Sequence, residues 1–318
     1  LEKFDKDTVN LLNNFKFINH LEKQITIDHF LITKKIINKN KINPDIIGFH
    51  GQTIFHDPKI SKSIQIGDAE LLKQLVKVDI IHNFRKTDLD FNGNGAPISP
   101  IYHKYLIESK NLKLPSCFIN IGGISNITYL DKNQLIGFDI GPGNCLIDRV
   151  VKDILGKSFD RNGALAFKGK VNNKKLNILL DDDYFKLDFP KSLDKNYFNK
   201  YLHIFNEDKI EDVLATLSTF TIKSIERQLL SLRRLPKNCI ITGGGLKNEF
   251  ICRGLMKIKN INFIPPKKLD INPDTLEAEM ICYLTARRIH NLPITFPTTT
   301  GVKKATTGGE LLKYIELN

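Results

Sequence analysis

The feature that most limits the fold of this sequence is a series of short apolar runs, several of which end in a glycine-rich polar turn. Phe118–Ile121 leads into Gly122 and Gly123, and Cys239–Thr242 leads into Gly243–Gly245. Short apolar runs bounded by turn residues are typical of buried strands. Helical patterns alternate with them, at residues 144–155, 211–232, 246–258 and 274–291. This alternation predicts an α/β fold with a mostly central sheet.

The other parts of the chain have weaker patterns. Roughly the first 38 residues are predicted to form two helices. The polar, weakly periodic stretch at about 171–205 is predicted to form short helices and surface loop. Further strands are predicted at residues 45–50, 63–66, 78–81, 127–130, 135–139 and 261–264. A polar loop is expected to follow the first of these strands, and the 318 residues suffice for two domains or one large one.

The composition argues against membranes and nucleic acids as partners. No apolar run approaches the roughly 20 residues of a membrane-spanning helix, and the first residues resemble an amphipathic helix rather than a signal peptide. The formal net charge is +12, but the lysines are spread thinly instead of forming a basic stripe with interleaved aromatic residues. We therefore predict neither nucleic acid nor membrane as a partner.

The five cysteines form no Cys-x-x-Cys pair, and most of them lie in apolar segments. They are predicted to be buried, reduced thiols rather than zinc ligands or disulfides. A chain of this kind is expected in the reducing cytoplasm.

The first glycine turn is predicted to be the tip of a hairpin, because apolar runs lie on both sides of Gly122-Gly123. A glycine tip can bring backbone N–H groups close to a phosphate. An ordinary tight hairpin would have the same sequence, so the motif alone leaves both interpretations open.

The second glycine turn, Gly243–Gly245, lies between a strand and a helix that carries Lys247 and Asn248. Three glycines at a helix N-terminus allow a flat ring or a phosphate to lie against the backbone. A close-packed strand–helix junction would also favour glycine, and the motif does not decide between the two.

An acidic residue leaves a third strand just before a stiff turn, in Gly137-Phe138-Asp139-Ile140 followed by Gly-Pro-Gly-Asn. A carboxylate fixed in this way suits a catalytic base, because a base within hydrogen-bond reach can accept a proton during the reaction. The alternative is that Asp139 only caps the helix that follows.

Two other segments are rich in polar groups for their setting. His50, Gln52 and His56 follow the first buried run, and Arg85 lies just before Asp88. The guanidinium of Arg85 could hold a carboxylate or phosphate through paired hydrogen bonds, or it could form a structural ion pair with Asp88. Each histidine, taken singly, fits a structural role better than a catalytic one.

Considered together and in order, these segments resemble one known family. They are FHGQTIFH, IQIGD, FRKTD, GNGAPISP, NIGGISNIT, GFDIGPGN, ITGGGLKN and LEAEMICYLTARR. The set is similar to that of bacterial anhydro-N-acetylmuramic acid kinases, and it extends from about residue 45 to Thr299–Gly301.

The resemblance implies a two-domain α/β fold of the sugar kinase, Hsp70 and actin type, which is ribonuclease H-like, with ATP in the cleft between the domains. Residues 1–96, completed by 303–318, would form the N-terminal domain. Residues 97–302 would form the C-terminal domain with the catalytic aspartate and the adenosine-binding turn. A homodimer is common in this family.

The resemblance also implies a reaction. Such kinases use ATP with Mg²⁺ to phosphorylate 1,6-anhydro-N-acetylmuramic acid while water opens its anhydro bridge. The product is N-acetylmuramic acid 6-phosphate, an intermediate in the recycling of cell-wall peptidoglycan.

The resemblance assigns roles to residues by their motif positions. Asp139 matches the general base. The substrate-binding positions are His50, Gln52, Arg85 and Glu277. The ATP-binding positions are Gly122, Gly123, Asn126, Gly243, Gly244, Gly245 and Asn248.

The sequence departs from the family pattern in two places. The family opens with a strand and a GTSxDGxD loop that meets the β- and γ-phosphates, and no such motif precedes residue 45. A fragment, a misplaced start or a loss of catalysis would each account for this difference. Asn83 stands where many relatives carry aspartate, so the role of that position is open.

Two other functions stay in competition with the anhydro-sugar kinase. A non-catalytic muramic-sugar-binding or regulatory protein on the same fold would bind the sugar without turnover. A kinase for a different amino sugar would differ in its substrate panel.

Overall fold

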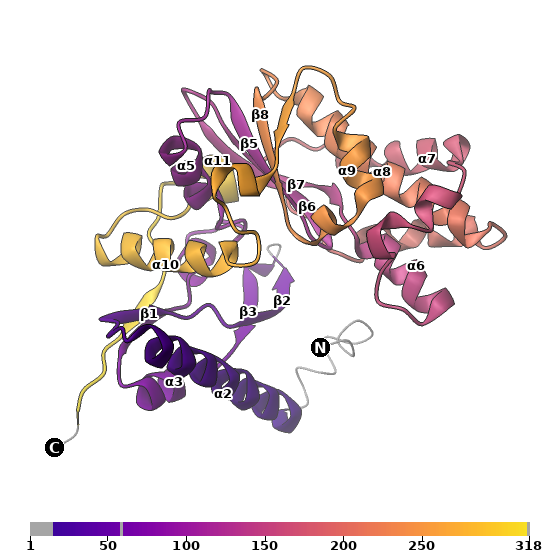
Figure 1. The fold of residues 1–318 in the computed structure, drawn as a ribbon. Coiled ribbons are helices and arrows are strands. Elements are labelled where there is room, and N and C mark those ends of the chain that lie inside the picture. Colours follow the sequence, from indigo (N-terminus) through magenta and orange to yellow (C-terminus); the bar gives the residue numbers. More distant parts are fainter. Residues whose placement is uncertain (1–14, 58–59, 317–318) are drawn as a thin grey trace. The chain divides into compact units, whose positions relative to one another are not determined.

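The structure, a computed structural model, describes residues 15–57 and 60–316 (Figure 1). The first of the two predicted N-terminal helices falls mainly on residues 1–14, outside the described residues. The second corresponds to α2, Phe15–Asn40. The α/β class predicted from the sequence is confirmed by the order of helices and strands along the chain.

The chain divides into two compact units. Unit 1 comprises the residues up to Ile98 together with those from Glu277 onward, and unit 2 comprises Ser99–Leu276. The chain therefore returns to unit 1 at Glu277, whereas the sequence analysis placed this return at residue 303. The cleft between two domains stays a prediction.

Unit 1 contains two small sheets. In the first, strand order is β1-β4-β10, with β1 parallel and β10 antiparallel to β4. The second is the antiparallel pair β2-β3, with a bulge between Thr53 and Phe55. The strands are β1 Ile46–Gly48, β2 Gln52–Asp57, β3 Lys62–Ile66, β4 Asp79–His82 and β10 Glu310–Leu312. Strand β2 occupies the segment predicted as a polar loop, and that prediction is wrong because β2 pairs with β3 through its whole length.

The helices of unit 1 are fixed to these sheets by short polar contacts and an apolar core. They are α2, α3 Ala69–Val76, α4 Lys86–Asp90, α10 Leu276–Ile289 and α11 Pro297–Thr300. Helix α3 begins where the Asp68 carboxylate accepts the Leu71 N–H (2.8 Å), a typical N-cap. The buried Thr26 hydroxyl of α2 accepts the Asp68 N–H (2.8 Å), which ties the two helices together. Phe49, Leu72 and Ile80 pack in the core beneath them.

Unit 2 is built on a five-stranded sheet with strand order β7-β6-β5-β8-β9. Strand β6 is antiparallel to both of its neighbours, β5 and β7, whereas β8 runs parallel to β5 and to β9. The strands are β5 Ser116–Ile121, β6 Ile124–Leu130, β7 Leu135–Pro142, β8 Asn238–Thr242 and β9 Asn262–Ile264. Every strand predicted from residue 116 onward is confirmed within a few residues. Because β5 and β8 are parallel neighbours, their carboxyl ends, and the glycine turns that follow them, lie at the same edge of the sheet.

Helices cover this sheet and form a continuous apolar core with it. They are α5 Pro100–Ser109, α6 Cys145–Leu155, α7 Asn173–Leu180, α8 Ile210–Ser231 and α9 Glu249–Leu255. Helix α8 is buried along most of its length, as Leu214, Leu217 and Phe220 show. Cys117 and Cys239 are fully buried, as predicted, but Cys282 is exposed.

The stretch at about 171–205, predicted as short helices and surface loop, does form short helices, but it belongs partly to the core. Phe185 and Phe198 are buried and pack against Phe220 of α8, and the buried ring of Tyr184 packs against both of them. The expectation of a surface position was wrong for these residues because they lie in 3₁₀ turns, whose spacing matches neither the helical nor the strand period.

None of the helices among the described residues combines the length and the apolar character that a membrane crossing needs.

Candidate functional site

The turn after β5 is a hairpin tip whose glycines leave open space. The structure confirms the predicted hairpin, with β5 and β6 paired antiparallel from Ser116↔Leu130 to Ile121↔Ser125. A side chain added at Gly122 would meet no atom closer than 3.5 Å, and one added at Gly123 none closer than 3.8 Å. Neither residue has a positive φ. The fold therefore does not require glycine at either position, and a bare backbone there suits the close approach of a ligand.

The turn after β8 combines structural glycines with one open glycine. Gly243 has φ +82°, and a Cβ there would lie 2.4 Å from the Asn120 side chain and 2.7 Å from Ile121 O. At Gly245 a Cβ would lie 2.4 Å from the Ile121 side chain. Gly244 is different, because the nearest atom to its Cβ position is Asn144 Nδ2 at 4.0 Å. Gly243 and Gly245 therefore pack against β5, whereas Gly244 faces outward.

The start of helix α6 holds the first glycine turn, Gly122-Gly123, in place. Gly143 N–H donates to Gly123 O (2.8 Å), and Asn144 N–H donates to Gly122 O (2.8 Å). The Asn144 side-chain amide also donates to Gly122 O (3.2 Å). A Cβ on Gly143 would fall 2.3 Å from Gly122 O, so this contact needs glycine. Unit 2 thus has a rigid edge at which open glycine backbone from two turns and a helix N-terminus come together, an arrangement suited to phosphate.

Asp139 lies on β7 and is held by backbone groups. Its N–H donates to Lys191 O (2.9 Å), and its carboxylate Oδ2 accepts the N–H of Leu193 (2.9 Å). The Tyr184 hydroxyl donates to its carbonyl oxygen (2.6 Å). The residue at the N-cap of α6 is Asn144. Asp139 therefore does not cap that helix, and its carboxylate is oriented instead by the segment around residue 193.

The two asparagines predicted to bind ATP, Asn126 and Asn248, lie in different surroundings. Asn126 is half-buried and pairs with Asp139 across β6 and β7. Asn248 is buried, its side-chain oxygen accepts the Ile251 N–H (3.3 Å), and it forms the N-cap of α9. This capping bond gives Asn248 a structural role, and its contact with nucleotide stays a prediction.

Two of the predicted sugar-binding residues contact each other in unit 1. Arg85 Nε–H donates to His50 Nε2 (3.1 Å), and Arg85 Nη1 donates to Gly95 O (3.3 Å). His50 Nδ1 lies 3.0 Å from Gly51 O. Since a carbonyl oxygen only accepts, Nδ1 carries the proton and Nε2 is the acceptor. His50 is thereby a neutral ring that orients the Arg85 guanidinium.

The surroundings of His50 and His56 keep both rings neutral. Burial, followed by the charge of Arg85, lowers the pKa of His50 to about 4. The same two causes, in the same order, lower the pKa of His56 to about 4. The ring nitrogens of His56 are buried without a hydrogen-bond partner. In unit 2, burial lowers the pKa of His103 to about 3.

We expect these three histidines to make the protein sensitive to acid. Unfolded histidines take up a proton near pH 6.5, whereas the folded rings of His50, His56 and His103 stay neutral down to about pH 4 or below. Stability is therefore complete above about pH 6.5 and is lost as the pH falls toward 4, by up to ~1.4 kcal/mol per pH unit for each fully buried ring. Urea unfolding at pH 7, 6, 5 and 4.5 measures this loss.

A histidine substitution isolates the contribution of one ring. His56→Gln should flatten the fall of stability below pH 6.5, whereas His290→Gln, at an exposed position, should leave it unchanged. If the free energy of unfolding falls equally steeply with pH in wild type and His56→Gln, then His56 does not contribute to the acid sensitivity.

The remaining predicted sugar-site residues, Gln52 and Glu277, also lie in unit 1. Gln52 is exposed and donates to Thr53 O (3.3 Å). Glu277 is exposed in the first turn of α10. Asp88 is buried, and its carboxylate accepts from Gly95 N–H (2.7 Å) and the Thr300 hydroxyl (2.6 Å). Asp88 thus joins the Gly93–Gly95 loop to α11, a role that the sequence did not reveal.

The structure accounts for asparagine at position 83. Its side-chain amide donates to Glu310 Oε2 (2.7 Å), and its backbone has φ +56°, a conformation that asparagine tolerates well. Lys86 also contacts Glu310, at 3.0 Å. An aspartate at position 83 would place a second carboxylate against Glu310.

Replacing Asn83 with aspartate is expected to destabilise unit 1 by ~1 kcal/mol, because a hydrogen bond is replaced by like-charge repulsion at a partly exposed site. Chemical denaturation at pH 7 measures the change. Adding Glu310→Gln to Asn83→Asp should restore most of the loss, since an amide can donate to the new carboxylate. Equal losses in the single and double variants would rule this explanation out.

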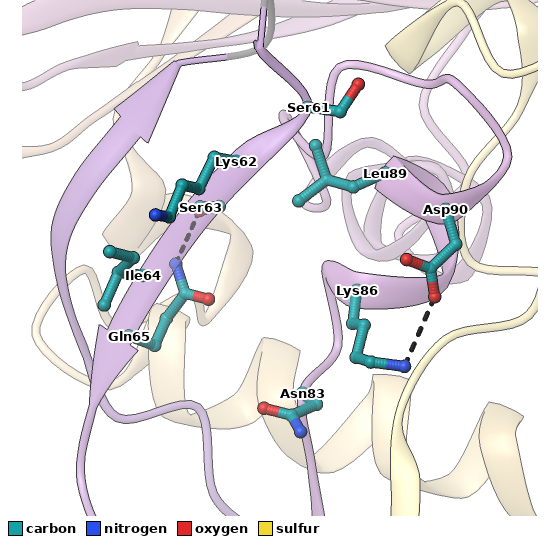
Figure 2. A pocket seen from close by; sticks show the side chains of 9 residues that line it. All are labelled: Ser61, Lys62, Ser63, Ile64, Gln65, Asn83, Lys86, Leu89 and Asp90. Atoms are coloured by element: carbon teal, nitrogen blue, oxygen red, sulfur yellow. Dashed lines mark hydrogen bonds and ion pairs between the residues drawn. The ribbon is translucent and has the colours of Figure 1, made fainter.

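One pocket of unit 1, with a volume of about 270 Å³, lies between β3 and α4 (Figure 2). It is lined by Ser61, Lys62, Ser63, Ile64, Gln65, Asn83, Lys86, Leu89 and Asp90. Lys86 is paired with Asp90 at 3.3 Å, so part of its charge is balanced within the lining. The sequence analysis singled out the Asn83–Asp88 segment but not the β3 side of this pocket, because exposed Ser, Lys and Gln on a strand carry no specific signal.

Comparison with known proteins identifies the family of this chain. The sequence profile of anhydro-N-acetylmuramic acid kinase matches residues 9–313. The kinase of that name from Pelagibacter ubique is 37% identical over 321 residues, covering 97% of this chain and 85% of the relative. The one from Zymomonas mobilis is 37% identical over 299 residues, covering 92% and 81%. The one from Rhodospirillum rubrum is 35% identical over 291 residues, covering 91% and 76%.

An α/β protein with a glycine hairpin, a second glycine turn beside it and a fixed aspartate on the adjacent strand belongs to the class of sugar kinases by its motifs and by this match. The chain belongs to the anhydro-N-acetylmuramic acid kinase family. The family resemblance stated from the eight motifs is confirmed.

Proposed function

We propose that this protein uses ATP to phosphorylate 1,6-anhydro-N-acetylmuramic acid and opens the anhydro bridge with water, giving N-acetylmuramic acid 6-phosphate for peptidoglycan recycling. The observation that carries the proposal is the open glycine surface at Gly122, Gly123 and Gly244, at one edge of the sheet whose strand β7 carries Asp139. Glycine at these three positions is needed neither for backbone conformation nor for packing. A nucleotide lying against this surface gives a reason for it.

In the proposed reaction Asp139 acts as the general base. It accepts a proton from water, the water oxygen bonds to the anomeric carbon, and the bond from that carbon to the bridging oxygen breaks. The released oxygen then attacks the γ-phosphorus, and ADP departs. The Leu193 N–H contributes by holding Oδ2 of the carboxylate in one orientation, because catalysis of this kind depends mainly on positioning.

The arginine of unit 1 suits the substrate by charge. The muramic sugar carries a lactyl carboxylate, and Arg85, oriented by His50, is a fixed cation that can pair with it. The neutral state of His50 matters here, since a protonated ring could not accept the Arg85 N–H. We propose Arg85 and His50 as the residues that hold the sugar, with Gln52 and Glu277 beside them.

The described residues offer no group of three or more His, Cys, Asp or Glu side chains that could hold a metal ion. Mg²⁺ would then accompany ATP, bound chiefly through the phosphates, as is usual for this ion. Its chemistry is to offset charge on the phosphates, and no step above depends on a protein-bound metal.

A direct assay tests the proposal. The full-length gene product, including any residues encoded upstream of Leu1, is incubated with anhydro-N-acetylmuramic acid and ATP in H₂¹⁸O. We expect a sugar 6-phosphate with one ¹⁸O at the anomeric carbon and one ADP for each sugar. Sugar binding without ADP release would favour the non-catalytic alternative, and turnover of a different amino sugar alone would favour the third interpretation.

A further inference from the structure

Asp139 lies at an irregular point on the edge of the sheet. Strand β7 is the outermost strand, next to β6 only. The pairing shifts between Ser125↔Gly141 and Asn126↔Asp139, so that Ile140 is an extra residue in β7. Such a bulge changes the direction of the side chains and interrupts the hydrogen-bond ladder between the strands, which would otherwise fix the strand. The conformation at Asp139 therefore depends on contacts from outside the sheet.

Those contacts come from one short segment within the stretch predicted as short helices and surface loop. Within residues 184–193, Lys191 accepts the Asp139 N–H, Tyr184 donates its hydroxyl to the Asp139 carbonyl, and Leu193 donates its N–H to the carboxylate. Three atoms of Asp139 are thus held by three residues of the same segment. The bond from Tyr184 is the shortest of the three, at 2.6 Å.

Tyr184 is itself held firmly as a donor. The ring is buried, and burial, followed by the charge of Asp139, raises the pKa of the phenol, which keeps the hydroxyl protonated. Lys191 lies over the ring, with Nζ 4.8 Å from the centroid, and donates to Tyr184 O (3.3 Å). The hydroxyl therefore has one orientation, toward Asp139.

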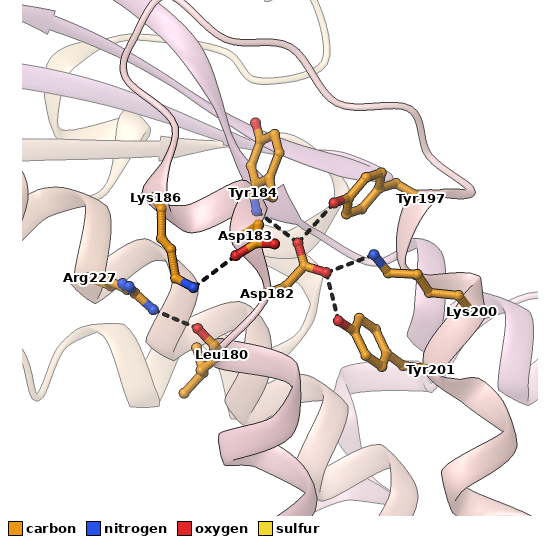
Figure 3. Close-up of polar contacts among 9 residues, drawn as sticks. All are labelled: Leu180, Asp182, Asp183, Tyr184, Lys186, Tyr197, Lys200, Tyr201 and Arg227. Carbon is orange, nitrogen blue, oxygen red and sulfur yellow. Dashed lines mark hydrogen bonds and ion pairs between the residues drawn. The ribbon is translucent and has the colours of Figure 1, made fainter.

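A buried carboxylate anchors Tyr184 from the other side (Figure 3). Asp182 accepts the Tyr184 N–H (2.8 Å), the Tyr197 hydroxyl (3.0 Å), the Tyr201 hydroxyl (2.7 Å) and Lys200 Nζ (2.8 Å). Burial alone would raise the pKa of Asp182, but these donors, Lys200 foremost, lower it. The ionised Asp182 carboxylate thus accepts hydrogen bonds from four groups next to the start of the 184–193 segment.

We propose that Tyr184 is a positioning residue for Asp139, and that Asp182 is the anchor that holds Tyr184 in place. This inference rests on the proposed role of Asp139 as the base. The hydroxyl of Tyr184 fixes the backbone of the bulged strand, and this keeps the Asp139 carboxylate against the Leu193 N–H. A catalytic group displaced by about 1 Å can lose roughly 100-fold in rate, so a single bond at this point has a measurable effect.

The test compares two tyrosine-to-phenylalanine variants that remove the same chemical group. Tyr184→Phe removes a hydroxyl that donates to the Asp139 carbonyl. Tyr129→Phe removes one that donates to Arg234 O (2.9 Å), also from a buried ring in unit 2. Both should lose a similar, small amount of stability, because each loses one buried hydrogen bond. We expect kcat to fall about 10-fold for Tyr184→Phe, with the KM for ATP unchanged, and to stay within about 2-fold for Tyr129→Phe.

A second readout separates positioning from a general structural effect. A carboxylate that loses a backbone donor is protonated more readily, so the acid limb of the kcat–pH profile should move to higher pH in Tyr184→Phe. The ¹³C carboxyl signal of Asp139, assigned by its absence in Asp139→Asn, should titrate with the same shift. Asp182→Asn, which weakens the anchor, should also move the acid limb of the kcat–pH profile and the carboxyl titration to higher pH, but by a smaller amount than Tyr184→Phe.

The outcomes are distinct. Equal kcat values for Tyr184→Phe and Tyr129→Phe, or a fall in kcat without movement of either titration, would overturn the positioning role while leaving the proposed reaction intact. If the wild type does not turn over the anhydro sugar, the proposed function fails, and the carboxyl titration still decides whether Tyr184 controls Asp139.

Discussion

Asp139→Asn should abolish nearly all turnover, with kcat falling by about 10²–10⁴-fold, the usual contribution of general acid–base catalysis. The substitution is close to isosteric, and its side-chain oxygen can still accept the Leu193 N–H that orients the native carboxylate. The variant therefore changes the capacity to take a proton and little else. Steady-state kinetics with anhydro-N-acetylmuramic acid and ATP measure the effect.

A matched variant and a binding measurement accompany this experiment. Asp153→Asn removes a carboxylate that pairs with Arg149 on the surface of α6, and it should keep wild-type kcat. ATP affinity, measured by calorimetry, should be unchanged in Asp139→Asn, because the glycine surface is intact. A variant with more than about a tenth of wild-type kcat would show that Asp139 is not the base.

Gly243→Ala is expected to have the largest effect on stability, a loss of roughly 2–5 kcal/mol in unit 2. One part comes from the positive φ of +82°, which costs a non-glycine residue about 1–2 kcal/mol. The other comes from a Cβ placed 2.4 Å from the Asn120 side chain and 2.7 Å from Ile121 O, an overpacking typically worth about 1–3 kcal/mol. Thermal unfolding should show a Tm lowered by roughly 5–12 °C.

Gly244→Ala is the matched control in the same turn, and it also tests the nucleotide site. Its Cβ would meet nothing closer than Asn144 Nδ2 at 4.0 Å, so stability should change by less than about 0.5 kcal/mol. If the adenosine lies against this backbone, the KM for ATP should rise about 10-fold or more. A stable Gly244→Ala variant with wild-type KM would place the nucleotide elsewhere.

Much of the fold could be predicted because its elements have strong local signals. The strands of unit 2 are short, mainly apolar runs such as Phe118–Ile121, and α8 has a helical pattern 22 residues long. Strand β2 was missed because His56 and Gln52 make it look polar. The burial of the aromatic residues in the 3₁₀ turns at 183–186 and 197–205 was missed because these residues follow no regular period.

The candidate site was predictable where glycine and charge stand in contiguous motifs. The glycine turns, Asp139 and Arg85 could all be named from the sequence, and their roles in binding and catalysis stay predictions. Which glycine serves packing and which serves a ligand could not be read from the motif Gly243–Gly245. That distinction depends on Asn120 and Ile121, more than 100 residues earlier in the chain.

The sequence by itself determined the family, the α/β class and the residue types available for catalysis, because motif order and local periodicity are properties of neighbouring residues. The tertiary structure decided that Asp139 is held by Tyr184 and Leu193, that Asp88 binds Thr300, and that Asn83 faces Glu310. Each of these contacts joins residues 45 to 227 positions apart. No local sequence pattern predicts such pairings, because they form only when sheets and helices pack together.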